Sequence, residues 1–219
     1  MSLKEHTVKS YDKDLQAIAS TLDEMLDLVS TSIDMVAEMI TDRHDDYLDK
    51  IAAHDYKINS LDFLIEKKIT AMLALRQPMA VDLRYIVSAL KVSSNLERVG
   101  DQAKSIIKKI HRIGCTAFDE NVKKSLLSMV SLSKRMVQDS VAAFNDQDLE
   151  KTDLVLKSDD EIDQIYSSFF KILEGGNFSK EQLEKLINIL FIAKSFERLA
   201  DHSTNIAEIS RYVVTGETK

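Results

Sequence analysis

Glycine and proline are almost absent from this chain, whose 219 residues include 5 Gly and 1 Pro. Sheet proteins of this length need many tight turns, and tight turns are built largely from these two residues. Charged residues make up 30% of the chain and apolar residues 44%, a mixture typical of long amphipathic helices. The composition therefore predicts an all-α protein and disfavours a sandwich, a barrel or a doubly wound α/β fold.

Apolar residues recur at steps of three and four along most of the chain, which indicates helices with one apolar face. Two such faces are Leu15, Ile18, Leu22, Met25, Val29, Ile33, Val36 and Ile40, and Leu83, Ile86, Leu90, Leu96, Val99, Ala103, Ile106 and Ile110. The pattern breaks near residues 41–46, 76–79, 113–119, 145–148 and 175–179. Six long helices are expected between these breaks.

Several residues mark where these helices begin, end or approach one another. Pro78 suits the first turn of a helix, where the missing N–H has no partner to lose. Ser179 and Gln182 have the spacing of a capping box, and Gly175-Gly176 is expected to end the preceding helix. Gly100 weakens a helix interior, so its presence predicts a close contact with a neighbouring helix.

The chain contains an internal repeat. The segment Glu97–Asp101 recurs as Glu197–Asp201, and the motif 55–59 recurs as 159–163. Short connections make successive helices antiparallel neighbours. We therefore expect two tandem three-helix bundles, residues 1–113 and 114–219, with six antiparallel helices in all.

Each repeated motif carries two oxygen-bearing side chains at positions i and i+4, which lie on one face of a helix. In each half the facing pairs have one midpoint: (55+101)/2 and (59+97)/2 both equal 78, and (159+201)/2 and (163+197)/2 both equal 180. Both midpoints fall in or beside the expected hairpin turns. In each folded hairpin, the two members of a pair are therefore expected to lie at the same height along the helices. The pairs are Asp55/Asp101, Asn59/Glu97, Asp159/Asp201 and Asp163/Glu197.

Such clustering of like charges favours a bound cation, because two carboxylates about 4 Å apart repel by roughly 1–4 kcal/mol. Oxygen ligands without cysteine suit Mg, Mn, Ca or Fe, and the more acidic second cluster should bind more tightly. The alternative is that these acids form ordinary surface salt bridges with Arg98, Arg198 or Lys104. The spacing alone leaves both interpretations open.

The net charge, the cysteine count and the lengths of the apolar runs indicate the kind of partner and the cell compartment. A formal net charge of −7 disfavours nucleic acid as the main partner. A single cysteine, Cys115, indicates a reducing compartment, and no apolar run is long enough to cross a bilayer. Since the first segment is also polar, a soluble cytoplasmic protein is expected. His202 follows Asp201 but is not expected to be a ligand, because the first repeat has Gln102 there.

The segments Arg76-Gln77-Pro78-x-Ala80-x-Asp82-Leu83-Arg84 and Asn95-Leu96-Glu97-Arg98-Val99-Gly100-Asp101 resemble the PhoU family of bacterial phosphate-uptake regulators. The resemblance implies two three-helix bundles with multinuclear clusters of Fe, Mn, Mg or Zn. The implied ligands are Asp55, Asn59, Glu97, Asp101, Asp159, Asp163, Glu197 and Asp201. Asn59 departs from a carboxylate pattern. The second repeat also lacks the 76–84 motif, which makes Asp82 and Arg84 candidates for a partner contact or, more simply, a cap and surface pair.

The resemblance also implies a function. PhoU-like proteins are non-enzymatic adaptors between the ATPase subunit of a phosphate ABC transporter and a phosphate-sensing histidine kinase. They repress phosphate uptake and the phosphate-starvation response, and they reach the membrane only through partners. A homodimer is possible. The alternatives are a helical scaffold without metal and a carboxylate-bridged di-iron enzyme. The second alternative is disfavoured because no Glu stands three residues before any His.

Overall fold

The computed structural model describes residues 3–76, 78–174 and 177–217, and within them it contains long α-helices and no strand. The helices are α1 (Leu3–Thr41), α2 (Tyr47–Arg76), α3 (Ala80–Ile113), α4 (Glu120–Asp146), α5 (Leu149–Glu174) and α6 (Lys180–Thr215). A 3₁₀ turn, η1 (Cys115–Ala117), lies between α3 and α4. The predicted all-α fold is therefore confirmed, with all helix ends at or near the predicted breaks.

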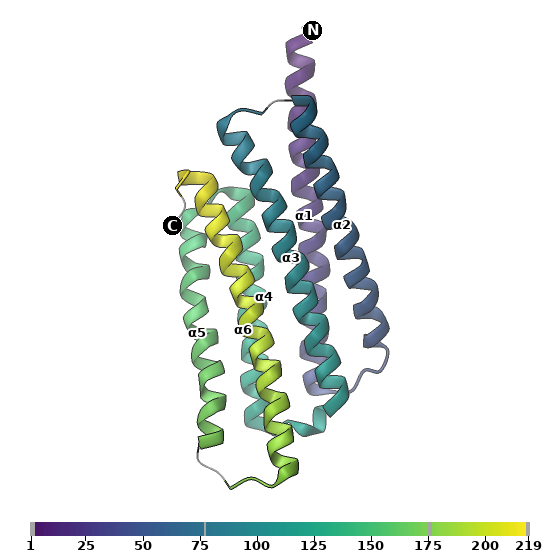
Figure 1. Cartoon of the computed structure of the whole chain (residues 1–219), viewed down its shortest axis with the longest axis vertical. Helices are drawn as coiled ribbons and strands as arrows, with labels where there is room; N and C mark the ends of the chain where they lie inside the picture. Colours follow the sequence, from purple (N-terminus) through teal and green to yellow (C-terminus); the bar gives the residue numbers. More distant parts are fainter. Residues whose placement is uncertain (1–2, 77, 175–176, 218–219) are drawn as a thin grey trace.

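The helices run side by side in two groups, α1–α3 and α4–α6 (Figure 1). Helix α2 packs on α1 and α3, and α5 packs on α4 and α6. Contacts of α3 with α6 and of α1 with α4 join the two groups, so α2 and α5 flank a central set of four helices. The α2–α3 turn around Pro78 and the α5–α6 turn around Ser179 lie at opposite ends of the molecule (Figure 1).

The core is formed by the predicted apolar faces. On α1, every residue of the predicted face from Ile18 to Ile40 is buried, while Leu15 is partly buried against the core. On α3 the prediction holds from Ile86 onward, with Leu90 partly buried. Leu83 is 40% exposed, because the first turn of α3 extends beyond the packed region.

The predicted capping box is confirmed at the start of α6. The Gln182 N–H donates to Ser179 Oγ at 3.2 Å, and the Ser179 N–H donates to Gln182 Oε1 at 2.9 Å. The prediction that Pro78 belongs to the first helical turn is wrong. Met79 is the N-cap of α3, and its carbonyl accepts the first intrahelical bond, from the Leu83 N–H at 3.1 Å. The Gly175-Gly176 pair and Gln77 lie outside the described residues.

Gly100 allows α2 to approach α3 closely. A Cβ atom at this position would lie 2.9 Å from Cδ1 of Ile58, which is itself fully buried on α2. Ordinary carbon–carbon contacts are about 3.5–4.0 Å. The close approach predicted from the sequence is therefore confirmed, and it occurs one residue before Asp101.

The helices are not membrane spans. Among residues 3–76, 78–174 and 177–217, none of them combines the length and the apolar character needed to cross a bilayer.

Candidate metal centres

The predicted ligands lie on the outer hairpin of each repeat. Helices α2 and α3 pack against each other in the first repeat, and α5 and α6 do so in the second. These predicted ligands are Asp55 and Asn59 on α2, Glu97 and Asp101 on α3, Asp159 and Asp163 on α5, and Glu197 and Asp201 on α6.

In the first cluster, three carboxylates come within electrostatic reach of one another. Partial burial raises the pKa of Asp101, and a hydrogen bond with Asp55 raises it further. Burial, followed by the charge of Asp101, likewise raises the pKa of Glu97. Asp55 is already neutralised, because Lys104 Nζ lies 2.5 Å from its Oδ2 and the Asp55 side chain is only 14% exposed.

Asp62 is a member of this cluster that sequence reasoning missed. Its charge raises the pKa of Glu97, and its Oδ1 accepts a hydrogen bond from Ser93 Oγ at 2.6 Å. Asp62 lies seven residues after Asp55, two helical turns along the same face, and this spacing could have revealed it. Asn59 is exposed, and its side chain makes no hydrogen bond to the rest of the described chain.

In the second cluster, all four predicted carboxylates influence one another. Burial raises the pKa of Asp159 to about 6, and the charges of Asp163 and Asp201 add to the effect. The pKa of Asp201 is also raised, first by burial and then by Glu197. Lys194 opposes this repulsion, since its Nζ lies 2.6 Å from Glu197 Oε2.

Each cluster thus contains one lysine, and the two lysines occupy opposite ends of the repeated motif. Lys104 follows the α3 motif by three residues, whereas Lys194 precedes the α6 motif by three. Neither lysine is duplicated, because Thr204 and Ser94 stand at the equivalent positions. Surface pairing of the first cluster with Lys104 was the alternative left open by the sequence, and Lys194 was not anticipated.

The two clusters differ in how well their side chains could hold a metal ion. Within the described ranges, no three His, Cys, Asp or Glu side chains converge closely enough to hold a metal ion. The second cluster fits a hard cation by its donors, which are four mutually repelling carboxylates. Binding there requires rotation of the side chains and displacement of Lys194. The first cluster fits less well, because Asn59, its fourth predicted donor, is an exposed amide and Asp55 is paired with Lys104.

Two further residues singled out by the sequence join the two repeats instead of the acid clusters. His202 Nδ1 lies 3.1 Å from Asn95 Oδ1 on α3, and burial lowers the pKa of this imidazole. Arg84 packs against the C-terminal cap of α6, where a Cβ on Gly216 would lie 3.4 Å from Nη1. The negative end of the α6 dipole favours a cation there. Asp82 is exposed in the first turn of α3.

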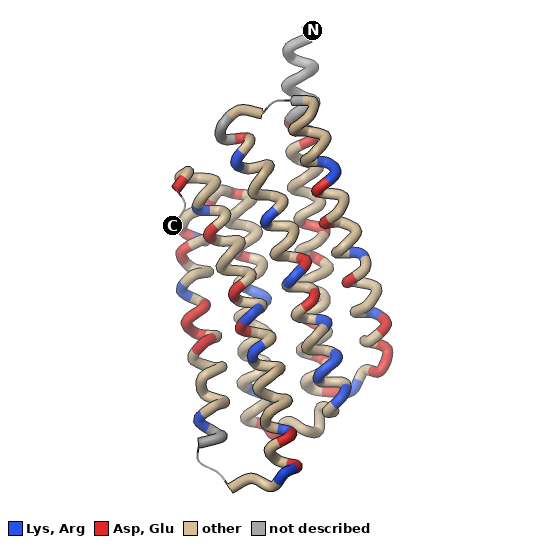
Figure 2. The backbone as a smooth tube through the Cα atoms, in the orientation of Figure 1, with Lys and Arg blue, Asp and Glu red and all other residues tan. Residues whose placement is uncertain are grey.

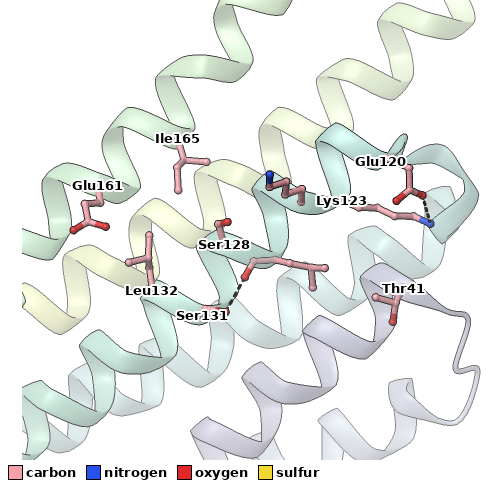
Figure 3. Close-up of a pocket in the computed structure, with 10 residues that line it drawn as sticks. Thr41, Glu120, Lys123, Ser128, Ser131, Leu132, Glu161 and Ile165 are labelled. Atoms are coloured by element: carbon pink, nitrogen blue, oxygen red, sulfur yellow. Dashed lines mark hydrogen bonds and ion pairs between the residues drawn. The ribbon is translucent and has the colours of Figure 1, made fainter.

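A groove of about 800 Å³ lies away from these clusters, between α4, α5 and the end of α1 (Figure 3). Its polar lining is engaged locally: Lys123 pairs with Glu120 at 3.7 Å, and Ser131 Oγ donates to the Leu127 carbonyl at 3.1 Å. This groove contains none of the predicted ligands. A smaller hollow of about 530 Å³ on α5 includes Asp163 of the second cluster.

Comparisons with known proteins agree with this architecture. The sequence profile of the PhoU domain matches residues 22–110 and 126–210. A phosphate-specific transport system accessory protein PhoU homolog from Caulobacter vibrioides is 34% identical over 98% of this chain and 94% of its own length. A protein of the same name from Clostridium acetobutylicum is 31% identical over 96% and 97%.

Solved structures show the same fold. The crystal structure of PhoU from Pseudomonas aeruginosa has a TM-score of 0.85 and 26% identity, and the match covers 94% of this chain and 100% of that one. The phosphate transport system regulatory protein PhoU from Streptococcus pneumoniae has a TM-score of 0.77 and 27% identity, with 97% and 99% covered. Because the domain matches twice and relatives align along nearly their whole length, this chain belongs to the PhoU family.

Proposed function

We propose that this protein is a regulatory accessory component of a phosphate-specific transport system. The observation that carries the proposal is the match of both repeats, in order, to relatives named as accessory proteins of that system. A solved relative is likewise described as a phosphate transport system regulatory protein. A non-enzymatic role is supported by the sequence, which lacks the Glu-x-x-His pairs of di-iron carboxylate enzymes.

In its finer form, the proposal makes the protein a negative regulator that connects the transporter's ATPase subunit to a phosphate-sensing histidine kinase. Deleting the gene from its host should then raise transcription from a phosphate-starvation promoter and alter uptake of labelled phosphate when phosphate is abundant. Restoring the gene should reverse both effects. Unchanged promoter activity and uptake in the deletion strain would refute the regulatory role.

We also propose that the second acidic cluster binds a divalent or trivalent cation. The support is the crowding of its four carboxylates: burial raises the pKa of Asp159 to about 6, and the charges of Asp163, Asp201 and Glu197 add to the effect. Asp159 and Asp163 of α5, with Glu197 and Asp201 of α6, would hold the ion, whose charge would replace that of Lys194. The ion would supply neutralisation of the cluster and a cross-link between the two helices. Mg, Mn, Fe and Zn are the candidates, and bridging carboxylates would allow more than one ion.

Metal analysis of the purified protein tests this proposal. The double variant Glu197→Ala/Asp201→Ala should lose bound metal. The matched control is Glu184→Ala, which removes an exposed acid of the same helix that has no ion pair in the described chain. Equal metal content in all three proteins would remove the ligand assignment. Glu97→Ala/Asp101→Ala tests the first cluster separately, where a smaller loss is expected because Lys104 already neutralises Asp55.

The competing possibility is a helical scaffold without metal, and the two lysine ion pairs favour it. Unfolding with and without chelator distinguishes the two cases. An ion at one hundred times its Kd stabilises the folded state by about 3 kcal/mol. The metal proposal therefore predicts a clear fall in melting temperature on chelation, and the scaffold predicts no change with Mg, Mn, Fe or Zn.

A further inference from the structure

The contact between α3 and α6 has a polar seam, which we define by the side-chain bonds that cross it. These bonds join Lys109 Nζ to Ser195 Oγ at 2.7 Å, Arg112 Nη2 to Asn188 Oδ1 at 2.5 Å, and His202 Nδ1 to Asn95 Oδ1 at 3.1 Å. Helices α3 and α6 are antiparallel, so later positions of α3 pair with earlier positions of α6 along the seam. Figure 2 shows basic positions along the lower half of α3 and the middle of α6.

At one end of the seam, Lys109, Arg112 and Arg198 form a cluster of cations. None of the three lies in an ion pair with a carboxylate elsewhere in the described chain. Lys109 is half-buried and donates only to hydroxyls, to Ser195 Oγ and, at 2.8 Å, to Ser105 Oγ. Burial lowers its pKa, and the positive charges of Arg198 and Arg112 lower it further. The charged groups that act on this ammonium are therefore both cationic.

The repeat provides an internal comparison for this cluster. The repeated motifs of α3 and α6 are offset by 100 residues. The positions equivalent to Ser195, Ser105, Lys109 and Arg112 are therefore Asn95, Asn205, Ile209 and Tyr212. These four counterparts line an open groove of about 890 Å³ at the other end of the α3–α6 seam. The counterpart of Arg198 is Arg98, so two of the three cations, Lys109 and Arg112, have no basic counterpart in the other repeat.

We propose that Lys109, Arg112 and Arg198, with the hydroxyl of Ser105, form a binding site for a phosphoryl-type oxyanion. An ammonium, guanidinium groups and the hydroxyl of Ser105 supply hydrogen-bond donors from several directions, which suits a tetrahedral anion. Ser195 instead holds the ammonium in place, because its Oγ accepts from Lys109 while donating to the Phe191 carbonyl at 3.0 Å. An anion also compensates positive charges that form no ion pair with a carboxylate of the described chain. Arg198 additionally lies within reach of Asp201, so Lys109 and Arg112 carry most of the uncompensated charge.

Of the three cations, Arg198 alone stands within the repeated acidic motif of the proposed metal centre, between Glu197 and Asp201. The proposed anion site does not depend on the proposed regulatory function. The shared chemistry is the phosphoryl group, and its source is either free phosphate or the headgroup of an anionic lipid. Two arms of one experiment distinguish these sources. Inorganic phosphate is titrated calorimetrically into the full-length protein, with chelator present to exclude metal-bound phosphate. In parallel, the protein is sedimented with phosphatidylglycerol vesicles and with neutral phosphatidylcholine vesicles.

Saturable binding is expected in at least one arm. Arg112→Gln removes an exposed charge and should weaken that binding about tenfold, a loss typical of one charge-assisted hydrogen bond. Lys109→Gln should weaken it at least as much. The matched control Lys108→Gln removes an equal charge from the neighbouring exposed position of α3, outside the seam, and should change affinity by less than about twofold.

Two results would overturn the proposal. One is the absence of binding in both arms up to about 10 mM phosphate, well above the millimolar affinities of weak specific sites. The other is equal weakening by Lys108→Gln and Arg112→Gln, which would show a diffuse charge effect. Circular dichroism of each variant confirms that its helices are intact, and Arg112→Gln keeps the test valid if Lys109→Gln unfolds the seam.

Discussion

Gly100→Ala tests the close approach of α2 to α3 that brings the first acidic cluster together. The new Cβ would lie 2.9 Å from Ile58 Cδ1, although its next contacts, Ile58 Cγ2 and Val29 Cγ2, are at ordinary distances of 3.8 and 3.9 Å. Overpacking a core by a methyl group costs about 1–3 kcal/mol. Replacing glycine inside a helix gains about 1 kcal/mol. The net expected effect is a destabilisation of about 1 kcal/mol.

The double variant with Ile58→Val isolates the single contact responsible. Valine lacks Cδ1, and Ile58→Val alone should cost about 0.5–1.5 kcal/mol. In that background the Cβ of Gly100→Ala meets only ordinary contacts, so the substitution should stabilise the protein by about 1 kcal/mol. The coupling between the two sites is therefore about 2 kcal/mol.

Urea unfolding of the wild type, the two single variants and the double variant, followed by circular dichroism, measures this cycle. Opposite signs for Gly100→Ala in the two backgrounds are expected. An equal gain in both backgrounds would refute the reasoning, because it would mean that α2 shifts without cost and that the glycine is not required for the contact.

The remaining predictions concern the charged clusters and a helix cap. The pKa of Asp159 is raised in the folded state, to about 6, so the penalty for its charge is present above pH 6 and is relieved as pH falls toward 4. Relief of this penalty should stabilise the metal-free protein by up to about 1 kcal/mol over that range, allowing for solvent screening. Asp159→Asn should remove that part of the pH dependence in urea unfolding, while the part due to Asp201, Glu97 and Asp101, whose pKa values are also raised, should remain. Lys104→Gln removes the partner of the mostly buried Asp55 and should cost about 1–2 kcal/mol at pH 7 in chelator. An unchanged urea midpoint at pH 7 would contradict that pairing. Ser179→Ala breaks the capping box of α6 and should cost about 1 kcal/mol in thermal unfolding, whereas Ser179→Asp should retain most of the stability. Equal melting temperatures for wild type and Ser179→Ala would show that the cap is dispensable.

The helices and their order could be predicted because their signals are local. The spacing of apolar residues on α1 and the capping residues of α6 depend only on nearby sequence. The approach of Asp55 to Asp101 and of Asp159 to Asp201 across the two hairpins could also be predicted, because the midpoint of each pair falls at or beside a turn. The position of Pro78 outside α3 could not, since the residue suits the extended backbone before a helix as well as its first turn.

The detailed composition of the clusters was harder to predict, because it depends on the rotation of each helix and on side-chain conformations. Asp62 enters the first cluster through its face of α2, and Lys194 reaches the second from one turn before the motif. Asn59, which the midpoint rule predicts to lie level with Glu97, is exposed. The seam between α3 and α6 depends on how the two repeats pack, which no periodicity within one helix reveals.

The most direct test of the central claim is a crystal structure of the metal-loaded protein with anomalous scattering recorded at the absorption edges of Mn, Fe and Zn. We expect an anomalous peak between Asp159 and Asp163 of α5 and Glu197 and Asp201 of α6, with Lys194 displaced. Density without a peak, with Lys194 still paired to Glu197, would contradict it.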